Sequence, residues 1–192
     1  LGEDAIEVWQ TLMLAQAQQC FFEKAAKDKL KPGVVARLAA QVATLYGTAA
    51  DGLREAKLHT DKSWPQLLAW HVSTFQAWTQ LHAAAEHVEA FEYGAQVARL
   101  SHAQGLMGDV VKTCKDGRTP EAQASYFNEA SDVVRHAAAD AVRHNNAVYH
   151  ERVPPLASLD AIEGKCIVKA MPVAELAAAA SSAAADADDA LF

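Results

Sequence analysis

Eight histidines and three cysteines are the residues of this 192-residue chain whose side chains could bind a metal ion. His82 and His87 are five positions apart, which places them on poorly matched faces of a helix, whereas zinc-binding helices use a spacing of four. His136 and His144 share a helix face, but they lie roughly 12 Å apart along its axis. The cysteines contain no CxxC pair. The spacing therefore predicts no metal site and no cofactor.

Catalytic signatures are also missing from the sequence. It contains no GxSxG, HExxH, P-loop or dinucleotide-binding motif, so we expect no enzyme activity. The formal net charge of -7 argues against nucleic-acid binding, which needs a basic surface. No apolar run approaches the roughly 20 residues of a membrane-spanning helix. An odd number of cysteines without a secretory signal favours a reducing compartment, so we expect the cytoplasm.

A candidate binding surface lies around two consecutive phenylalanines, Phe21 and Phe22. Consecutive helical residues point about 100° apart, so one ring can enter the core while the other faces outward. Val34 and Leu38 follow one turn apart at the start of the next helix. Five cations surround these residues, namely Lys24, Lys27, Lys29, Lys31 and Arg37. An apolar strip with a basic rim suits an amphipathic helix of acidic character, although the same apolar residues could simply pack the first helix pair.

The elements that position these residues are predicted to be helices. Hydrophobic residues make up 51% of the chain against 21% charged residues, and only 9 Gly and 6 Pro interrupt it, which is typical of a folded helical protein. In the first helix we expect the apolar stripe to include Ile6, Trp9, Leu12, Met13, Cys20 and Phe21. The expected helices are Asp4–Lys27, Val34–Leu58, Trp64–Ala90, Phe91–Cys114 and Pro120–Asn146.

Several boundaries of these helices can be predicted from local signals. Ser63 is the expected N-cap of the third helix, and Thr119 with Pro120 is expected to cap and begin the fifth. The fourth helix either continues the third or follows a kink. Short loops between long helices indicate antiparallel neighbours, so the predicted fold is an all-α, solenoid-like bundle.

The C-terminal part has a different texture. Prolines 154, 155 and 172 forbid a continuous helix, so residues Tyr149–Val173 are expected to be mostly extended, with at most a short turn near Leu159–Ile162. The apolar residues of this segment predict that it packs on the helices. The alanine-rich stretch Ala174–Phe192 is expected to be a weak helix or a disordered tail.

The block Leu12–Ala25 has the sequence LMLAQAQQCFFEKA. This block resembles the core signature of the Bro-one domain of the ALIX family. Four further blocks are similar and occur in family order; they are Ala36–Gln41, Tyr93–Leu100, Asn145–Pro154 and Ile167–Val173. The resemblance covers most of residues 11 to 173. It implies that residues 1–173 form the C-terminal part of such a domain, without its N-terminal part, and that 174–192 are a tail or the start of another region.

The resemblance also implies a function. Members of this family have a boomerang-shaped, tetratricopeptide-like helical domain that binds the C-terminal helix of charged multivesicular body proteins, which are ESCRT-III subunits. Such binding recruits the adaptor to endosomes, budding sites or the cytokinetic bridge. The family's apolar patch corresponds to Phe21, Val34 and Leu38, with Lys24 beside it. Two departures stand out: Val34 is smaller than the isoleucine expected there, and Pro32-Gly33 suggests a later start of the second helix.

Tyr149 matches a family tyrosine that resembles a phosphorylation site for a Src-family kinase and a docking site for an SH2 domain. Its other interpretation is a half-buried tyrosine that pins the extended segment to the helices. The alternative function for the whole chain is a purely structural helical arm, as in a rhophilin-like or His-domain phosphatase-like scaffold.

Overall fold

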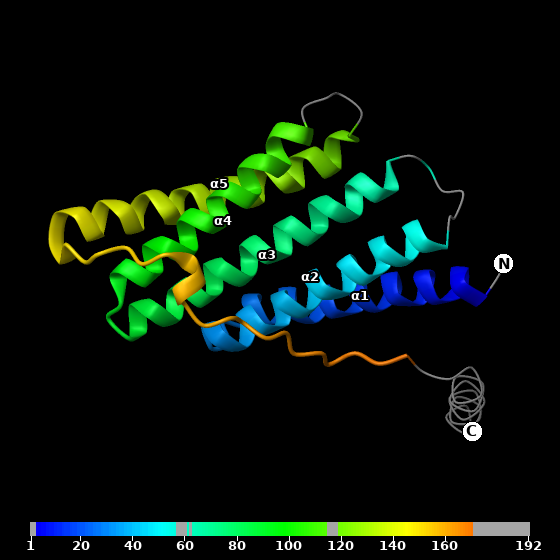
Figure 1. The fold of residues 1–192 in the computed structure, drawn as a ribbon, viewed down its shortest axis with the longest axis horizontal. Helices are drawn as coiled ribbons and strands as arrows, with labels where there is room; N and C mark the ends of the chain where they lie inside the picture. Colours follow the sequence, from blue (N-terminus) through cyan, green and yellow to red (C-terminus); the bar gives the residue numbers. More distant parts are fainter. Residues whose placement is uncertain (1–2, 57–60, 62, 115–118, 171–192) are drawn as a thin grey trace, which may run out of the picture.

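Five helices form the body of the molecule (Figure 1). The computed structural model describes residues 3–56, 61, 63–114 and 119–170. Each helix packs on the next one along the chain as an antiparallel neighbour, as the short connections predict. The all-α prediction is confirmed, and the described residues contain no strand. The helices are α1 (Glu3–Lys27), α2 (Pro32–Glu55), α3 (Trp64–Glu89), α4 (Tyr93–Cys114) and α5 (Glu121–His144).

The core follows this row of helices from one pair to the next. Phe75 of α3 is fully buried between α1 and α2, and Phe127 of α5 is 1% exposed against α3 and α4. Alanines fill much of the remaining interface, including Ala15, Ala39 and Ala103, each with no exposed surface. Small side chains let neighbouring helices approach closely, so a continuous core forms although each helix contributes few large residues.

Helix α3 begins at Trp64 as predicted, and the other four helices begin one or two residues away from the predicted positions. Helix α2 begins at Pro32, not at Val34, because proline has the right φ angle for the first helical position and needs no N–H partner there. Helix α5 begins at Glu121 with Pro120 as its N-cap, one residue later than predicted. Ser63 is the N-cap of α3 as predicted, but its side chain makes no capping hydrogen bond.

The boundary between α3 and α4 is a true break. Phe91 adopts a left-handed backbone conformation with φ 59°, which ends α3 and lets the chain reverse. Phe91 is also 74% exposed, so its ring is not buried by this turn. The fourth helix is therefore separate from the third.

After α5 the chain makes a π-helical turn, Asn145–Tyr149, and then reverses. Tyr149 is thus the last helical residue, whereas the sequence placed it in the extended segment. Residues 150–170, here called the strap, then run back across the row of helices towards α1 (Figure 1). The strap is mostly extended, and its short 3-10 turn lies at Leu156–Ser158, earlier than predicted. The rest of the predicted segment, 171–173, and the tail 174–192 lie outside the described residues.

The start of the strap is fixed by Asn145. Its side-chain amide donates to the carbonyl oxygen of Glu151 (2.9 Å) and accepts from the Glu151 backbone N–H (3.1 Å). The Glu151 carboxylate accepts from the N–H of Gly94 at the start of α4 (2.7 Å). A Cβ atom on Gly94 would overlap the carbonyl oxygen of Arg152. Glycine is therefore needed at this position for the strap to pass so close to α4.

Candidate partner-binding face

Two pairs of consecutive apolar residues divide between the core and the surface. Phe22 is 6% exposed and packs edge-to-face on Phe75, with ring centroids 5.5 Å apart, whereas Phe21 is 47% exposed. On α2, Val35 is 2% exposed and Val34 is 38% exposed. The inward member of each pair already packs the helices together. The outward member of each pair therefore keeps a large part of its apolar surface exposed.

Leu38 is placed differently from the other two predicted anchors. It is 4% exposed and belongs to the core cluster shared by α1, α2 and α3. Leu38 therefore belongs to the core and offers almost no area to a partner. Leu30, in the connection between α1 and α2, is 45% exposed and was not selected from the sequence. We call Phe21, Val34 and the exposed cations near them in the sequence the docking face; these cations are Lys24, Lys27, Lys29, Lys31 and Arg37.

The cations of the docking face are mostly unpaired. Lys24 is exposed and pairs with Asp28 one turn later (2.8 Å), which raises the pKa of Lys24 through that hydrogen bond. For the other four cations, no carboxylate of the described residues lies within ion-pairing distance; they are Lys27, Lys29, Lys31 and Arg37. These four side chains are therefore available to an acidic ligand. Lys24 is available as well, because an exposed ion pair such as Lys24–Asp28 contributes little to stability and is easily exchanged.

A pocket of about 620 Å³ opens beside Val34. Arg99 of α4 lines this pocket and is 5% exposed. Its guanidinium donates to Nε2 of His87 (2.8 Å), to Oε1 of Gln80 (3.0 Å) and to the carbonyl oxygen of Asp160 in the strap (2.9 Å). Burial lowers the pKa of Arg99, and the nearby carboxylates of Asp160 and Glu86 oppose that shift. Arg99 thus ties α3, α4 and the strap together at the back of the pocket.

The strap also borders the docking face. Its Lys165 N–H donates to the carbonyl oxygen of Arg37 (2.9 Å). Gln18, three residues before Phe21, donates to the Lys165 carbonyl oxygen (2.9 Å) and accepts from the Ile167 N–H (3.1 Å). Gln18 has no exposed surface, so this two-sided contact is shielded from water. The strap therefore lies in a fixed path between α1 and α2 next to the docking face.

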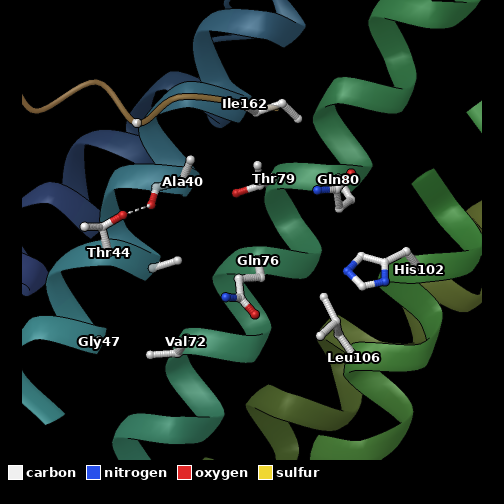
Figure 2. A pocket seen from close by; sticks show the side chains of 12 residues that line it. Ala40, Thr44, Gly47, Val72, Gln76, Thr79, Gln80, His102, Leu106 and Ile162 are labelled. Carbon is white, nitrogen blue, oxygen red and sulfur yellow. Dashed lines mark hydrogen bonds between the residues drawn. The ribbon is translucent and has the colours of Figure 1, made fainter. Parts of the chain in front are cut away.

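A second groove, of about 580 Å³, lies between α2, α3 and α4. Figure 2 shows Gln76 and His102 around this groove, with Ile162 of the strap at its rim. None of the residues that line it is a carboxylate or a thiol. Thr44 and Thr79 donate their hydroxyl groups to backbone carbonyls of their own helices, at 3.0 Å and 2.7 Å. The groove offers hydrogen-bonding groups but no paired acid and base.

Within the described residues, the histidines do not gather into a metal site. His71 and His82 lie among aromatic rings of the core, and burial lowers the pKa of each to about 4. No group of three His, Cys, Asp or Glu side chains in the described ranges could hold a metal ion. The three cysteines are free thiols, and only Cys114 is buried. Among the described residues, no helix is long and apolar enough to cross a bilayer.

Comparison with known proteins shows which family this row of helices and its strap belong to. The sequence profile described as "BRO1-like domain" matches residues 1–192. The chain belongs to the BRO1-like domain family.

Among its relatives, the programmed cell death 6-interacting protein of Xenopus laevis is 34% identical over 175 residues, which are 90% of this chain and 19% of that protein. The vacuolar protein-sorting protein bro1 of Aspergillus fumigatus is 33% identical over 180 residues, which are 92% of this chain and 17% of that protein. The chain thus spans less than a fifth of the length of either relative.

Solved BRO1 structures are similar to the fold of this BRO1-like chain. A structure described as an ALIX BRO1 CHMP4C complex has a TM-score of 0.79 and 32% identity, and the match covers 89% of this chain and 46% of that one. A second structure, described as the basis for endosomal targeting by the Bro1 domain, has a TM-score of 0.73 at 14% identity and 86% coverage of this chain. The second likeness concerns the fold alone.

Tyr149 of this BRO1-like chain lies far from the docking face in sequence, at the end of the π-helical turn that precedes the strap. Its ring stacks on Tyr93 of α4, with centroids 3.3 Å apart and an angle of 8° between the planes. It is 42% exposed. The ring thus pins the end of α5 to the start of α4, and its use as a phosphorylation or SH2-docking site stays a prediction.

The residues that hold the strap of this BRO1-like chain were not selected from the sequence. Gln18 could have been found, because it falls on the buried stripe of α1 at helical spacing from Ala15 and Phe22. A polar residue on such a stripe needs a hydrogen-bond partner. Arg99 gives no comparable signal, because it is simply one cation within a helix.

Proposed function

We propose that this chain is the protein-binding module of an adaptor, and that its docking face binds the C-terminal amphipathic helix of an ESCRT-III subunit. Phe21 and Val34 would contact the apolar stripe of that helix, and Lys24 with Arg37 would attract its acidic side chains. Leu38 would form the floor below Val34. The observation that carries the proposal is the outward position of Phe21 and Val34 beside fully packed neighbours.

The comparisons support the class of partner. One similar solved structure is a complex of the ALIX BRO1 domain with CHMP4C, and one relative is named for vacuolar protein sorting. On this proposal the chain acts without catalysis in the cytoplasm, and the ESCRT-III subunit recruits it to endosomal membranes. A Src-family kinase or an SH2 domain at Tyr149 would be a separate partner. Phosphorylation there would add nearly two negative charges to a ring that is stacked on Tyr93.

The test is titration of a fluorescent peptide that carries the C-terminal helix of a charged multivesicular body protein. Phe21→Ala should weaken binding by about 1–3 kcal/mol if the ring is a central anchor. Met13→Ala is the matched control, because Met13 is an equally exposed apolar residue (54%) two turns earlier on α1. Raising the salt concentration should also weaken binding, because the cations are exposed.

Leu38→Ala needs a different measurement. Because Leu38 is buried, its truncation should reduce the free energy of unfolding by about 2–5 kcal/mol. Binding by this variant is therefore interpretable only where circular dichroism shows a folded chain. Saturable binding by the wild type that persists in Phe21→Ala would exclude this face. No binding by a folded wild type would favour the structural-arm function instead.

A further inference from the structure

The helix that presents Val34 and Arg37 has no cap of its own. The N-cap residue of α2, Lys31, makes no side-chain capping hydrogen bond, and the first turn contains no acidic residue. Pro32 has no N–H group, while the N–H groups of Val34 and Val35 donate to the Lys31 carbonyl oxygen at 2.9 Å and 3.2 Å. The positive end of the α2 dipole is therefore not balanced by any side chain of α2.

A carboxylate from another helix lies at this end. An ideal Cβ atom built on Gly33 would overlap Oε1 of Glu86 and would lie 2.5 Å from its Cδ and 2.8 Å from its Oε2. The Glu86 carboxyl group thus occupies the space where any other residue at position 33 would place its side chain. Glu86 belongs to α3 and is exposed on its other side, in the wall of the pocket beside Val34.

Charges of both signs lie near this carboxylate. Lys31 and the buried Arg99 line the same pocket, and so do the carboxylates of Asp160 and Glu163. Arg99 forms no ion pair with a carboxylate in the described part of the chain, but the charge of Glu86 opposes the lowering of the Arg99 pKa. The next residue along α3, His87, accepts a hydrogen bond from Arg99 (2.8 Å). Glu86 therefore faces the N-terminus of α2 on one side and a buried guanidinium on the other.

We propose that Glu86 is a positioning residue for the docking face. Its carboxylate lies at the N-terminus of α2 and acts there as an electrostatic cap: its negative charge, without a direct hydrogen bond to α2, balances the positive end of the helix dipole and stabilises the first turn that carries Val34. The proposal rests on the proposed function of that face. Gly33 leaves room for the carboxylate in its present position, because a Cβ atom at position 33 would force the carboxylate to move. Glu86 itself needs no contact with the partner.

The cap alone is tested by local hydrogen exchange without any partner. Glu86→Gln keeps the size of the side chain and removes its charge. The amides of Gly33, Val34 and Val35 should then exchange roughly two- to fivefold faster, the range expected for a charge at a helix terminus, while amides in the middle of α2 stay unchanged. Glu89→Gln is the control, because it removes an exposed charge from the same end of α3. Equal exchange in both variants would overturn the proposal.

A double-mutant cycle tests the role of Gly33. Alanine normally favours a helix over glycine, so Gly33→Ala should raise the unfolding midpoint in a Glu86→Ala background. In the wild type the new Cβ displaces the carboxylate, so the same substitution should raise the midpoint less or lower it. Equal effects of Gly33→Ala in the two backgrounds would show that the carboxylate does not occupy this site.

Peptide binding tests the positioning role. Both Glu86→Gln and Glu89→Gln remove a negative charge near the docking face, and this change alone should strengthen binding of an acidic partner helix in both variants. Only Glu86→Gln also removes the cap, which should weaken binding. Glu86→Gln should therefore bind the peptide about two- to fivefold more weakly than Glu89→Gln. Equal binding by the two variants would overturn the positioning role. If the wild type does not bind the peptide, the proposed function fails, while exchange and the double-mutant cycle still decide the cap.

Discussion

The helices and the strap are held in place by different kinds of interaction. The helices bury large apolar side chains, of which Phe75 and Phe127 are almost completely enclosed. No residue of the strap, 150–170, is buried. Side chains of the helices instead bind its backbone, through Gln18, Arg99 and Asn145. One chain thus combines a body stabilised by the hydrophobic effect with a segment whose path is specified by directional polar contacts.

The difference separates stability from placement. Apolar burial contributes in proportion to area and has little directional preference, so it can hold a row of helices together but cannot define the path of a narrow segment. Hydrogen bonds contribute less net free energy but demand a defined geometry. We therefore expect substitutions in the helices to change global stability, and substitutions at the strap contacts to change local order.

The largest effect is expected in the helical core. Phe75→Ala should reduce the free energy of unfolding by about 3–5 kcal/mol, because it leaves a cavity between α1, α2 and α3. Val153→Ala, in the strap and 44% exposed, should change it by less than about 0.5 kcal/mol. Urea denaturation followed by circular dichroism measures both values. Similar losses in the two variants would contradict the division between body and strap.

Acid should weaken the body through two partly buried histidines, His71 and His82. Burial lowers the folded-state pKa of His71 and His82 from 6.5 to about 4, so the folded protein favours their neutral forms. Their contribution is complete above pH 6.5 and is lost as the pH falls towards 4, by up to about 3 kcal/mol for each histidine. In His71→Phe the loss of unfolding free energy between pH 7 and pH 5 should be smaller than in wild type. The exposed His136→Gln is the control, and an unchanged pH dependence in His71→Phe would contradict this account.

On the strap side, Gln18→Ala should have the next largest effect. The substitution removes the hydrogen-bond partner of the Lys165 carbonyl oxygen and that of the Ile167 N–H. If these two backbone groups stay shielded from water, the free energy of unfolding should fall by about 1–3 kcal/mol. If the strap instead detaches locally, global stability changes less, while the amides from 165 to 168 exchange much faster. Hydrogen exchange by mass spectrometry distinguishes this variant from Gln16→Ala, an exposed glutamine on the same helix. If the strap amides exchange as slowly in Gln18→Ala as in the wild type, the side-chain amide of Gln18 is not what holds the strap in place.

Glycines give the smallest effects, with opposite signs in the two regions. Gly47 is within α2 and has no atom within 4 Å of a built Cβ, so Gly47→Ala should stabilise the protein by about 0.5–1 kcal/mol. A Cβ on Gly164 would lie 3.0 Å from the backbone N and Cα atoms of Gln41, so Gly164→Ala should destabilise the strap. Thermal unfolding measures the first effect and exchange of strap amides the second. A stabilised strap in Gly164→Ala would mean that this close approach is not required.

The sequence predicted the helices well and the buried face of α1 poorly. Helix existence follows from periodicity and from the rarity of breakers, and these signals are local. The predicted stripe of α1 favoured its large side chains, but Ile6 and Met13 are exposed, while the buried face contains Ala5, Ala15 and Ala25. Close helix packing prefers small residues at the contact, and a pattern based on large hydrophobic residues does not detect this preference.

The residues of the docking face were only partly predictable, because the sequence pattern does not show which apolar side chains become buried. The pattern showed that Phe21 and Phe22 could not both point inwards, but nothing local decides which ring enters the core. That choice depends on Phe75 of α3, more than fifty residues away in the sequence. The strap contacts were not predictable, because side-chain amides that bind a distant backbone leave no periodic signal. Only Gln18, on a stripe of buried residues, gave a hint.

The contact between Gln18 and the strap joins residues 147 and 149 positions apart in the sequence. Each helix can pair with its predecessor as soon as it is made, because those contacts are local and form quickly. The strap, in contrast, can close over α1 only after residue 167 is available. A chain emerging from the ribosome would therefore assemble its row of helices first and dock the strap beside the docking face last. Since the contact between Gln18 and the strap forms late, we expect substitutions that weaken this contact to speed unfolding and to leave the folding rate nearly unchanged.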